Sequence, residues 1–253
     1  MVLPFAEEQT VTLESAIRNL VIANRILAHE GVVDAYGHVS IRHPDNPEHY
    51  LLSRSRSPEL VEAGDIMEFS FDGAAVGGDK RQPYLERFIH GSIYASRPEV
   101  TAVVHSHADD VLPFSVSLTT RLRPVVLTAG CMGNHIPLWD IRNKFGDTNM
   151  LVTNVEQGRD LATTLERNNV VLMCGHGFAA AGRSLAEAVR IAVYLPKNAR
   201  VYMEALRLGE VRILSPGEVE QKMVKNPTAP EIVRAWEYWA KRAGCGHLLD
   251  GAV

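Results

Sequence analysis

The chain of 253 residues is poor in the features that mark secreted and membrane proteins. Its three cysteines, Cys131, Cys174 and Cys245, include no CxxC pair, so we expect no disulfide framework and a reducing, cytoplasmic setting. No apolar run approaches the roughly 20 residues that a membrane-spanning helix needs. No basic segment precedes an apolar stretch near the N-terminus, so a secretory signal is not expected either.

Basic residues are not in excess, because 26 lysines and arginines stand against 30 aspartates and glutamates, for a net charge of -4. This balance argues against a general nucleic-acid binder, although it could still hide a local basic patch, and it leaves room for a small anionic molecule as partner. Hydrophobic residues make up 46% of the sequence, as in an ordinary globular chain. The sequence has no repeat and no Pro/Gly-rich linker, so we expect one domain over residues 1–253, with a helical extension over about 215–253.

Hydrophobic periodicity along the chain alternates between a value near 3.6 and a value near 2, which predicts a mixed α/β fold. Helices are predicted over residues 12–30, 84–96, 160–167 and 184–208, in a stretch opening at 215–218, and over 231–241. Strands are predicted over residues 38–42, 50–53, 66–71, 100–104, 122–128 and 170–173, the first three as an antiparallel meander. Pro196 is expected to kink the 184–208 helix or to end it.

Ten histidines are unusually many for this length, and two of them share the end of an apolar strand. In Val103-Val-His105-Ser-His107 the two imidazoles stand at positions i and i+2, so strand alternation points both to one face. Such a pair can hold one side of a metal ion. Taken alone, it could equally be a chance pair at a strand edge, hydrogen-bonded to water.

A second apolar strand delivers a histidine in the same way, because Val170-Val-Leu-Met-Cys-Gly leads into His176 and Gly177. Three histidines at strand ends would leave coordination positions open, as in a catalytic metal site. Glu86 lies on the helix before the His105 strand and could be a fourth ligand or a proton carrier, although an exposed helix glutamate is the usual reading. His90, one turn after Glu86, is expected to support the site or the fold without binding the metal.

The order of these motifs resembles the class II aldolase/adducin family over residues 15–210. The resemblance rests on Gly37-His-Val-Ser-Ile-Arg42, the helix with Glu86, the His-x-His pair and the later His-Gly. It implies a single three-layer α/β/α domain around a mainly antiparallel central sheet, commonly a four-fold tetramer with active sites at subunit boundaries. It also implies one divalent metal per subunit, Mn, Zn, Fe or Co, held by the three histidines, with the glutamate as acid/base.

Departures from the family's sugar-phosphate aldolases indicate a different substrate. Their phosphate-binding elements are replaced here by His38, by Ser53-Arg54-Ser55-Arg56-Ser57 and by Tyr84-Leu85 ahead of Glu86. Guanidinium and hydroxyl groups suit bidentate recognition of a carboxylate. These segments are similar to the family branch of hydroxyaromatic decarboxylases, which act on dihydroxyphthalates and on a hydroxymethylpyridine dicarboxylate, and a branch of non-haem iron oxygenases is also close.

The resemblance implies a metal-dependent decarboxylase in which the metal is a Lewis acid and Glu86 protonates the ring. For that role the pKa of Glu86 must be raised, which we expect from apolar neighbours such as Leu85 and Phe88. Arg54 or Arg56 would hold the second carboxylate, with Ser53 and Ser55 beside them, and His38 would hydrogen-bond a ring hydroxyl. The arginines could instead be ordinary surface residues. The competing functions are a retro-aldol lyase, an iron oxygenase and, least favoured, a non-catalytic adducin-like module.

Some residues keep two interpretations at this stage. Asp34 and Tyr36 could line the pocket or end the first helix. The aromatic residues of the tail, Trp236, Tyr238 and Trp239, could be packing residues or could cover the pocket of a neighbouring subunit.

Overall fold

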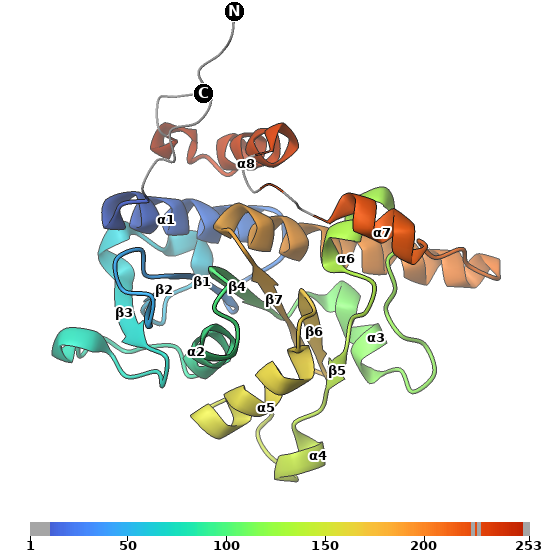
Figure 1. The fold of residues 1–253 in the computed structure, drawn as a ribbon, viewed down its shortest axis with the longest axis horizontal. Coiled ribbons are helices and arrows are strands. Elements are labelled where there is room, and N and C mark those ends of the chain that lie inside the picture. The colour runs from blue at the N-terminus through green and yellow to red at the C-terminus, as the bar shows by residue number, and fades with distance from the viewer. Residues whose placement is uncertain (1–10, 224–225, 227–228, 250–253) are drawn as a thin grey trace, which may run out of the picture.

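A computed structural model describes residues 11–223, 226 and 229–249 of the chain. Its described residues form one seven-stranded sheet with the order β3-β2-β1-β4-β7-β6-β5. Figure 1 shows this sheet with helices on either side of it. The strands are β1 (His38–Arg42), β2 (His49–Ser53), β3 (Ile66–Ser70), β4 (Ala102–Ser106), β5 (Leu138–Trp139), β6 (Val170–Met173) and β7 (Gly177–Gly182). Every neighbouring pair is antiparallel except β5 and β6, which are parallel.

Helices cover both faces of the sheet, which gives three layers (Figure 1). One hydrophobic core joins the sheet to α1 (Leu13–His29), α6 (Leu185–Leu208) and α8 (Pro230–Arg242). A second core joins the opposite face to α2 (Arg87–Ser96) and α5 (Val155–Leu165). The other described α-helices are α3 (Leu112–Val116), α4 (Arg142–Phe145) and α7 (Pro216–Lys222). The expected three-layer fold around a mainly antiparallel sheet is confirmed.

Most of the strands predicted from alternating or apolar sequence patterns are present in the sheet. The antiparallel meander of β1, β2 and β3 is confirmed, with Ser40 opposite Leu52 and Tyr50 opposite Phe69. The sequence missed β7, whose run Gly-Phe-Ala-Ala-Ala-Gly lacks the β-branched residues typical of strands, and β5, which has two residues.

The strand predicted over residues 122–128 is wrong, because the structure has a loop there that leads into a 3-10 helix at Leu127–Met132. The side chain of Asn198 on α6 takes the place of a partner strand. Its Oδ1 accepts the Val125 amide at 2.9 Å, and its Nδ2 donates to the Arg123 carbonyl at 2.9 Å. These side-chain bonds satisfy backbone groups that would otherwise need a sheet neighbour.

The bounds of two helices differ from the sequence prediction. The helix predicted over 84–96 begins at Arg87, so Glu86 lies just before its first residue. The helix predicted over 160–167 begins earlier, because Asn154 caps α5 by accepting the Gln157 amide, and it ends at Leu165. Pro196 does not end α6, which runs through it as one helix of 24 residues.

Within the described part of the chain, no helix has the length and apolar composition that crossing a membrane would need. The single-domain organisation stays a prediction, and the N-terminal segment judged to lack a signal lies outside the described residues.

Candidate metal centre

Three neighbouring strands bring the predicted ligands to one end of the sheet. His105 lies near the end of β4 and pairs with His38 at the start of β1. His107 follows β4 by one residue, and His176 lies in the turn between β6 and β7. Glu86 precedes the first residue of α2, which packs beneath this end of the sheet. Glu86, the pair His105 and His107, and His176 come from three segments that are far apart in the sequence, and the strand order together with the packing of α2 brings them together.

Two glycines allow the backbone to close around the site. A Cβ on Gly177 would lie 2.0 Å from the Ser106 carbonyl oxygen, so no other residue fits without moving β4. A Cβ on Gly37 would lie 2.7 Å from Val33 and 3.0 Å from the His105 carbonyl oxygen, and its φ of +86° also favours glycine. Both glycines of the family motifs therefore serve the close approach of the strands that carry the histidines.

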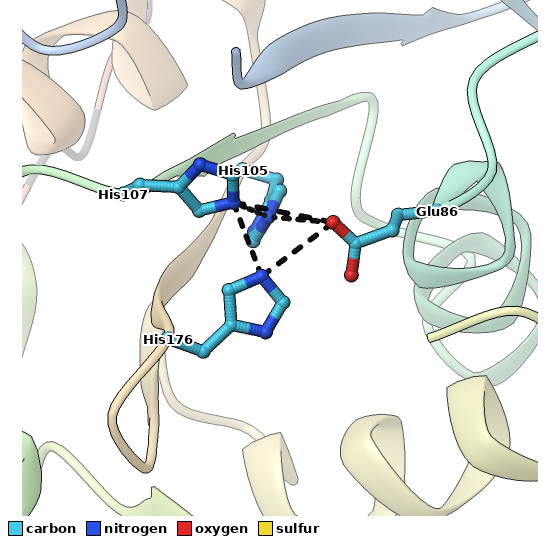
Figure 2. Close-up of side chains that lie close together, drawn as sticks. All are labelled: Glu86, His105, His107 and His176. Carbon is cyan, nitrogen blue, oxygen red and sulfur yellow. Dashed lines mark hydrogen bonds and ion pairs between the residues drawn. The ribbon is translucent and has the colours of Figure 1, made fainter. Parts of the chain in front are cut away.

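Figure 2 shows the three imidazole rings and the Glu86 carboxylate pointing to a common centre. The Nε2 atoms of His105 and His107 are 2.9 Å apart, and those of His107 and His176 are 3.1 Å apart. Glu86 Oε2 lies 3.5 Å from the Nε2 atoms of His105 and His176 and 4.0 Å from that of His107. One ligand atom from each residue therefore lies within 4.8 Å of the other three.

The orientation of the rings fits a divalent metal. His105 Nδ1 lies 3.0 Å from the Phe178 carbonyl oxygen, which can only accept, so Nδ1 donates there and Nε2 faces the other ligand atoms. Burial, followed by repulsion from His105 and His176, lowers the pKa of His107 to about 4, so His107 is neutral near pH 7. Imidazoles with a carboxylate are ligands that zinc, manganese, iron and cobalt accept.

Glu86 is held in place by a backbone group that the sequence could not reveal. Its Oε1 accepts the Val152 amide at 3.0 Å, which leaves Oε2 facing the histidines. Burial alone would raise the pKa of this carboxyl, but the attraction and hydrogen bonds of His105 and His176 outweigh burial, so the pKa lies below its usual range. The expectation of a raised pKa is therefore wrong, because it considered the apolar neighbours of Glu86 and not the histidines.

His38 lies directly beside the ligand histidines, with its ring centroid 5.0 Å from that of His105. It is buried, and its Nδ1 lies 2.6 Å from His90 Nε2. Tyr84 packs on the other side of the ring at 4.6 Å between centroids. The structure thus places His38 at the edge of the site and gives His90 a hydrogen bond to it.

Arg54 and Arg56 follow β2, which ends at Ser53. They meet at Asp65, a buried aspartate that the sequence analysis missed. Arg54 Nε donates to Asp65 Oδ1 at 2.6 Å, and Arg56 Nη1 donates to Oδ2 at 2.9 Å. The carboxylate fixes both guanidinium groups on one side and leaves this cluster of three with a net charge of +1.

Tyr84 links this arginine cluster to the metal centre. Its hydroxyl donates to the Arg56 carbonyl oxygen, and its ring contacts His38. Ser53 is fully buried at the end of β2, whereas Ser55 is exposed and donates its amide to the Gln82 carbonyl. The substrate-binding roles of the two arginines and the two serines stay predictions.

The structure distinguishes between several of the residues for which the sequence left two interpretations. Tyr36 lies beyond the end of α1 and is 68% exposed, with its ring centroid 6.4 Å from that of His107, so it stands at the rim of the site. Asp34 accepts the Tyr36 amide. In the tail, Trp239 is buried in the core and Tyr238 is 55% exposed.

Comparison with known proteins shows to which family the chain is similar. The model of the class II aldolase and adducin N-terminal domain matches residues 18–203. Decarboxylase tropJ of Talaromyces stipitatus is 32% identical, over 92% of this chain and 95% of that protein. A 3,4-dihydroxyphthalate decarboxylase of Arthrobacter keyseri is 28% identical, over 79% of this chain and 82% of that protein.

Solved structures agree on the fold. An L-fuculose 1-phosphate aldolase from Glaciozyma antarctica superposes with a TM-score of 0.72 at 21% identity, over 96% of this chain and 95% of that one. The family match, the sequence relatives and the fold point the same way, and the two decarboxylases agree with the branch that the motifs resemble. The chain belongs to the class II aldolase and adducin family.

Proposed function

We propose that the protein is a metal-dependent decarboxylase of a hydroxylated aromatic or heteroaromatic dicarboxylate. The observation that carries this proposal is the convergence of three histidines and Glu86, linked through Tyr84 to an arginine pair that Asp65 holds in place. The names of two relatives support the class of reaction. The dihydroxyphthalate and the 3-hydroxy-2-methylpyridine-4,5-dicarboxylate types are the substrates that this arrangement suits best.

Glu86 is proposed to carry the proton. Because its pKa is low, the resting group is a carboxylate and first acts as a base, taking the proton of the phenolic hydroxyl of the bound substrate. The bond to the departing carboxylate then breaks, CO₂ leaves, and its electron pair stays on the ring carbon. Glu86 returns its proton to that carbon, and the phenolate of the product takes a proton from solvent.

His105, His107 and His176 would hold the metal, with Glu86 next to it or as a fourth ligand. A divalent metal there supplies Lewis acidity that stabilises the negative charge developing on the phenolic oxygen. The Val152 amide keeps Glu86 oriented so that one oxygen stays free for the proton. The substrate is thus activated at one end by the metal centre.

The arginine cluster is proposed to hold the carboxylate that stays on the product. Asp65 occupies Arg54 Nε and Arg56 Nη1, so with respect to the described residues the other guanidinium N–H groups remain for a ligand. Ser53 and Ser55 would support this end. His38 would bind a ring oxygen, since its ring centroid lies 5.0 Å from that of His105 and 4.6 Å from that of Tyr84. This separation of roles gives a dicarboxylate two distinct binding ends.

We also propose a cytoplasmic homotetramer or higher homo-oligomer with active sites at subunit boundaries. The family resemblance supports it, and large apolar side chains such as Leu118 and Leu127 are exposed on this chain, at 92% and 66%. Light scattering of the purified protein tests the assembly, and a monomer at micromolar concentration would rule it out.

The decisive test is release of CO₂ by protein that has been stripped of metal and reloaded with Mn, Zn, Fe or Co. The panel holds 3,4-dihydroxyphthalate, 4,5-dihydroxyphthalate and the hydroxymethylpyridine dicarboxylate, beside fuculose and rhamnulose phosphates. Metal-dependent CO₂ from a dicarboxylate is the expected result. Cleavage of a sugar phosphate without CO₂ release would refute the decarboxylase proposal in favour of an aldolase.

The aldolase alternative has its own support, because a 5-methylthioribulose-1-phosphate/5-deoxyribulose-1-phosphate aldolase of Rhodospirillum rubrum is 33% identical over 66% of this chain. Tyr84 argues against a phosphate cradle here, since its ring fills the space beside His38. An iron oxygenase would instead consume oxygen and would require a redox metal. Oxygen uptake measured in the same panel separates that outcome.

A further inference from the structure

A string of four hydrogen-bonded side chains runs from the hydrophobic core to the edge of the metal centre. The Tyr94 hydroxyl lies 2.7 Å from Ser40 Oγ, and Ser40 Oγ lies 2.6 Å from His90 Nδ1. On the other side of the same ring, His90 Nε2 lies 2.6 Å from His38 Nδ1. The string therefore joins α2 to β1 and ends at the histidine that lies beside His105.

The string lies fully inside the molecule, where unpaired polar groups are costly. His90 and Ser40 have no exposed surface, Tyr94 has 1% and His38 has 4%. Tyr50 stacks on the His90 ring at an interplanar angle of 12°. Burial, followed by repulsion from His105, lowers the pKa of His90 to about 3, so this imidazole is neutral and carries one proton. One nitrogen of His90 is then a donor and the other an acceptor, so all hydrogen bonds of the string donate in the same sense, either from Tyr94 to His38 or from His38 to Tyr94.

The Tyr94 end decides the direction. A buried phenolic O–H has to donate to an acceptor, and the structure places Ser40 Oγ within its reach among the described residues. Ser40 then donates its own O–H to His90 Nδ1, which must be unprotonated. The His90 proton is consequently on Nε2 and is donated to His38 Nδ1. In the opposite direction the Tyr94 O–H would be left without an acceptor.

We propose that this string holds His38 as the tautomer with its proton on Nε2, so that His38 donates a hydrogen bond to an anionic oxygen of the substrate. Tyr94, Ser40 and His90 are positioning residues in this proposal. The inference deepens the proposed function and rests on it for the identity of the ligand. It predicts a preference for a phenolate or carboxylate oxygen at this point over a group that must itself donate.

The tautomer can be read directly in the unmodified protein. The zinc-loaded full chain is labelled with ¹⁵N-histidine, and long-range ¹H–¹⁵N correlation spectra report which ring nitrogen of each histidine carries the proton. The signals of His38 are those lost in the His38→Asn variant. We expect Nε2–H and a bare Nδ1 for both His38 and His90. A proton on Nδ1 of His38 would overturn the proposal.

Variants test whether the string acts on the reaction. Ser40→Ala removes the donor to His90 Nδ1, so His38 should populate both tautomers, and kcat/KM for CO₂ release should fall by about fivefold to thirtyfold, the effect of one buried hydrogen bond. The matched control is Tyr50→Phe. It removes a buried hydroxyl that donates to the Arg87 carbonyl and keeps the ring that stacks on His90. Equal kcat/KM values in the two variants would refute the positioning role.

The two readouts separate this proposal from the proposed function. The spectra need no substrate, so they decide the tautomer even if none of the tested dicarboxylates releases CO₂. If CO₂ is released and His38 nevertheless has its proton on Nδ1, the proposed function stands and the string has been assigned the wrong direction.

Discussion

Replacing Asp65 with asparagine tests whether the arginine cluster is built around this one carboxylate. The Asp65 side chain is 7% exposed and accepts from Arg54 Nε, from Arg56 Nη1 and, at 2.9 Å, from the Glu62 amide. In Asp65→Asn an NH₂ group replaces one oxygen and faces donors in either orientation of the amide, either Arg54 Nε or both Arg56 Nη1 and the Glu62 N–H. At least one bond to a guanidinium group is therefore lost together with the negative charge, and at least one donor is left opposed.

The size of the effect follows from burial. A hydrogen bond to a charged group contributes about 1.5–3 kcal/mol when it is buried. The guanidinium groups of Arg54 and Arg56 are 38% and 29% exposed, so solvent replaces part of what they lose. We therefore expect a loss of about 2–3 kcal/mol in the free energy of unfolding, and a fall in Tm of about 4–12 °C.

The pH dependence adds an independent check. Burial opposes ionisation of Asp65, but the Glu62 amide and the guanidinium groups of Arg54 and Arg56 outweigh it, and the pKa lies below its usual value. A group with a depressed pKa contributes stability above its unfolded-state pKa, near 4, and loses it as the pH falls through the folded-state pKa. The difference between the wild type and Asp65→Asn should be constant from about pH 5 to pH 7 and shrink below about pH 4.

Thermal unfolding followed by circular dichroism between pH 3 and pH 7 measures both effects. The control is Glu204→Gln, which removes an ion pair with Arg207 whose side chains are 59% and 69% exposed, and it should change stability by less than about 0.5 kcal/mol. The reasoning fails if Asp65→Asn matches this control at pH 7. It also fails if its deficit grows as the pH falls.

Three further predictions concern the metal centre. His105→Ala should lose bound zinc, measured by atomic emission after gel filtration, together with all metal-dependent turnover, and retention of stoichiometric zinc would exclude His105 as a ligand. Glu86→Gln should keep the zinc and lower kcat by about 100-fold or more, the contribution of a general acid/base, whereas near-normal turnover would rule out the proton carrier. Gly177→Ala should lower stability by about 1–3 kcal/mol and weaken zinc binding, because the new Cβ meets the Ser106 carbonyl. Gly64→Ala, which meets no atom within 4 Å, is its control in urea unfolding.

Local patterns in the sequence were enough to identify the strands that carry the ligands. Apolar runs that end in histidine reveal β4 and β6, and the order of the motifs identifies the family over most of the chain. These signals work because alternation along a strand and the chemistry of imidazole act within a few residues. They also predicted the antiparallel meander of β1, β2 and β3, which depends on short connections, whereas the three-layer arrangement was implied by the family resemblance.

Contacts between distant segments were decided by the tertiary structure alone. Asp65 lies beside Arg54 and Arg56 because β3 pairs with β2, and Val152 reaches Glu86 through a backbone amide that has no sequence signal. The low pKa of Glu86 likewise depends on histidines that are remote in the sequence. Sequence therefore determined which groups are the candidates for the chemistry, whereas tertiary packing determined their partners and protonation, because hydrogen bonds and charge interactions depend on distance in space.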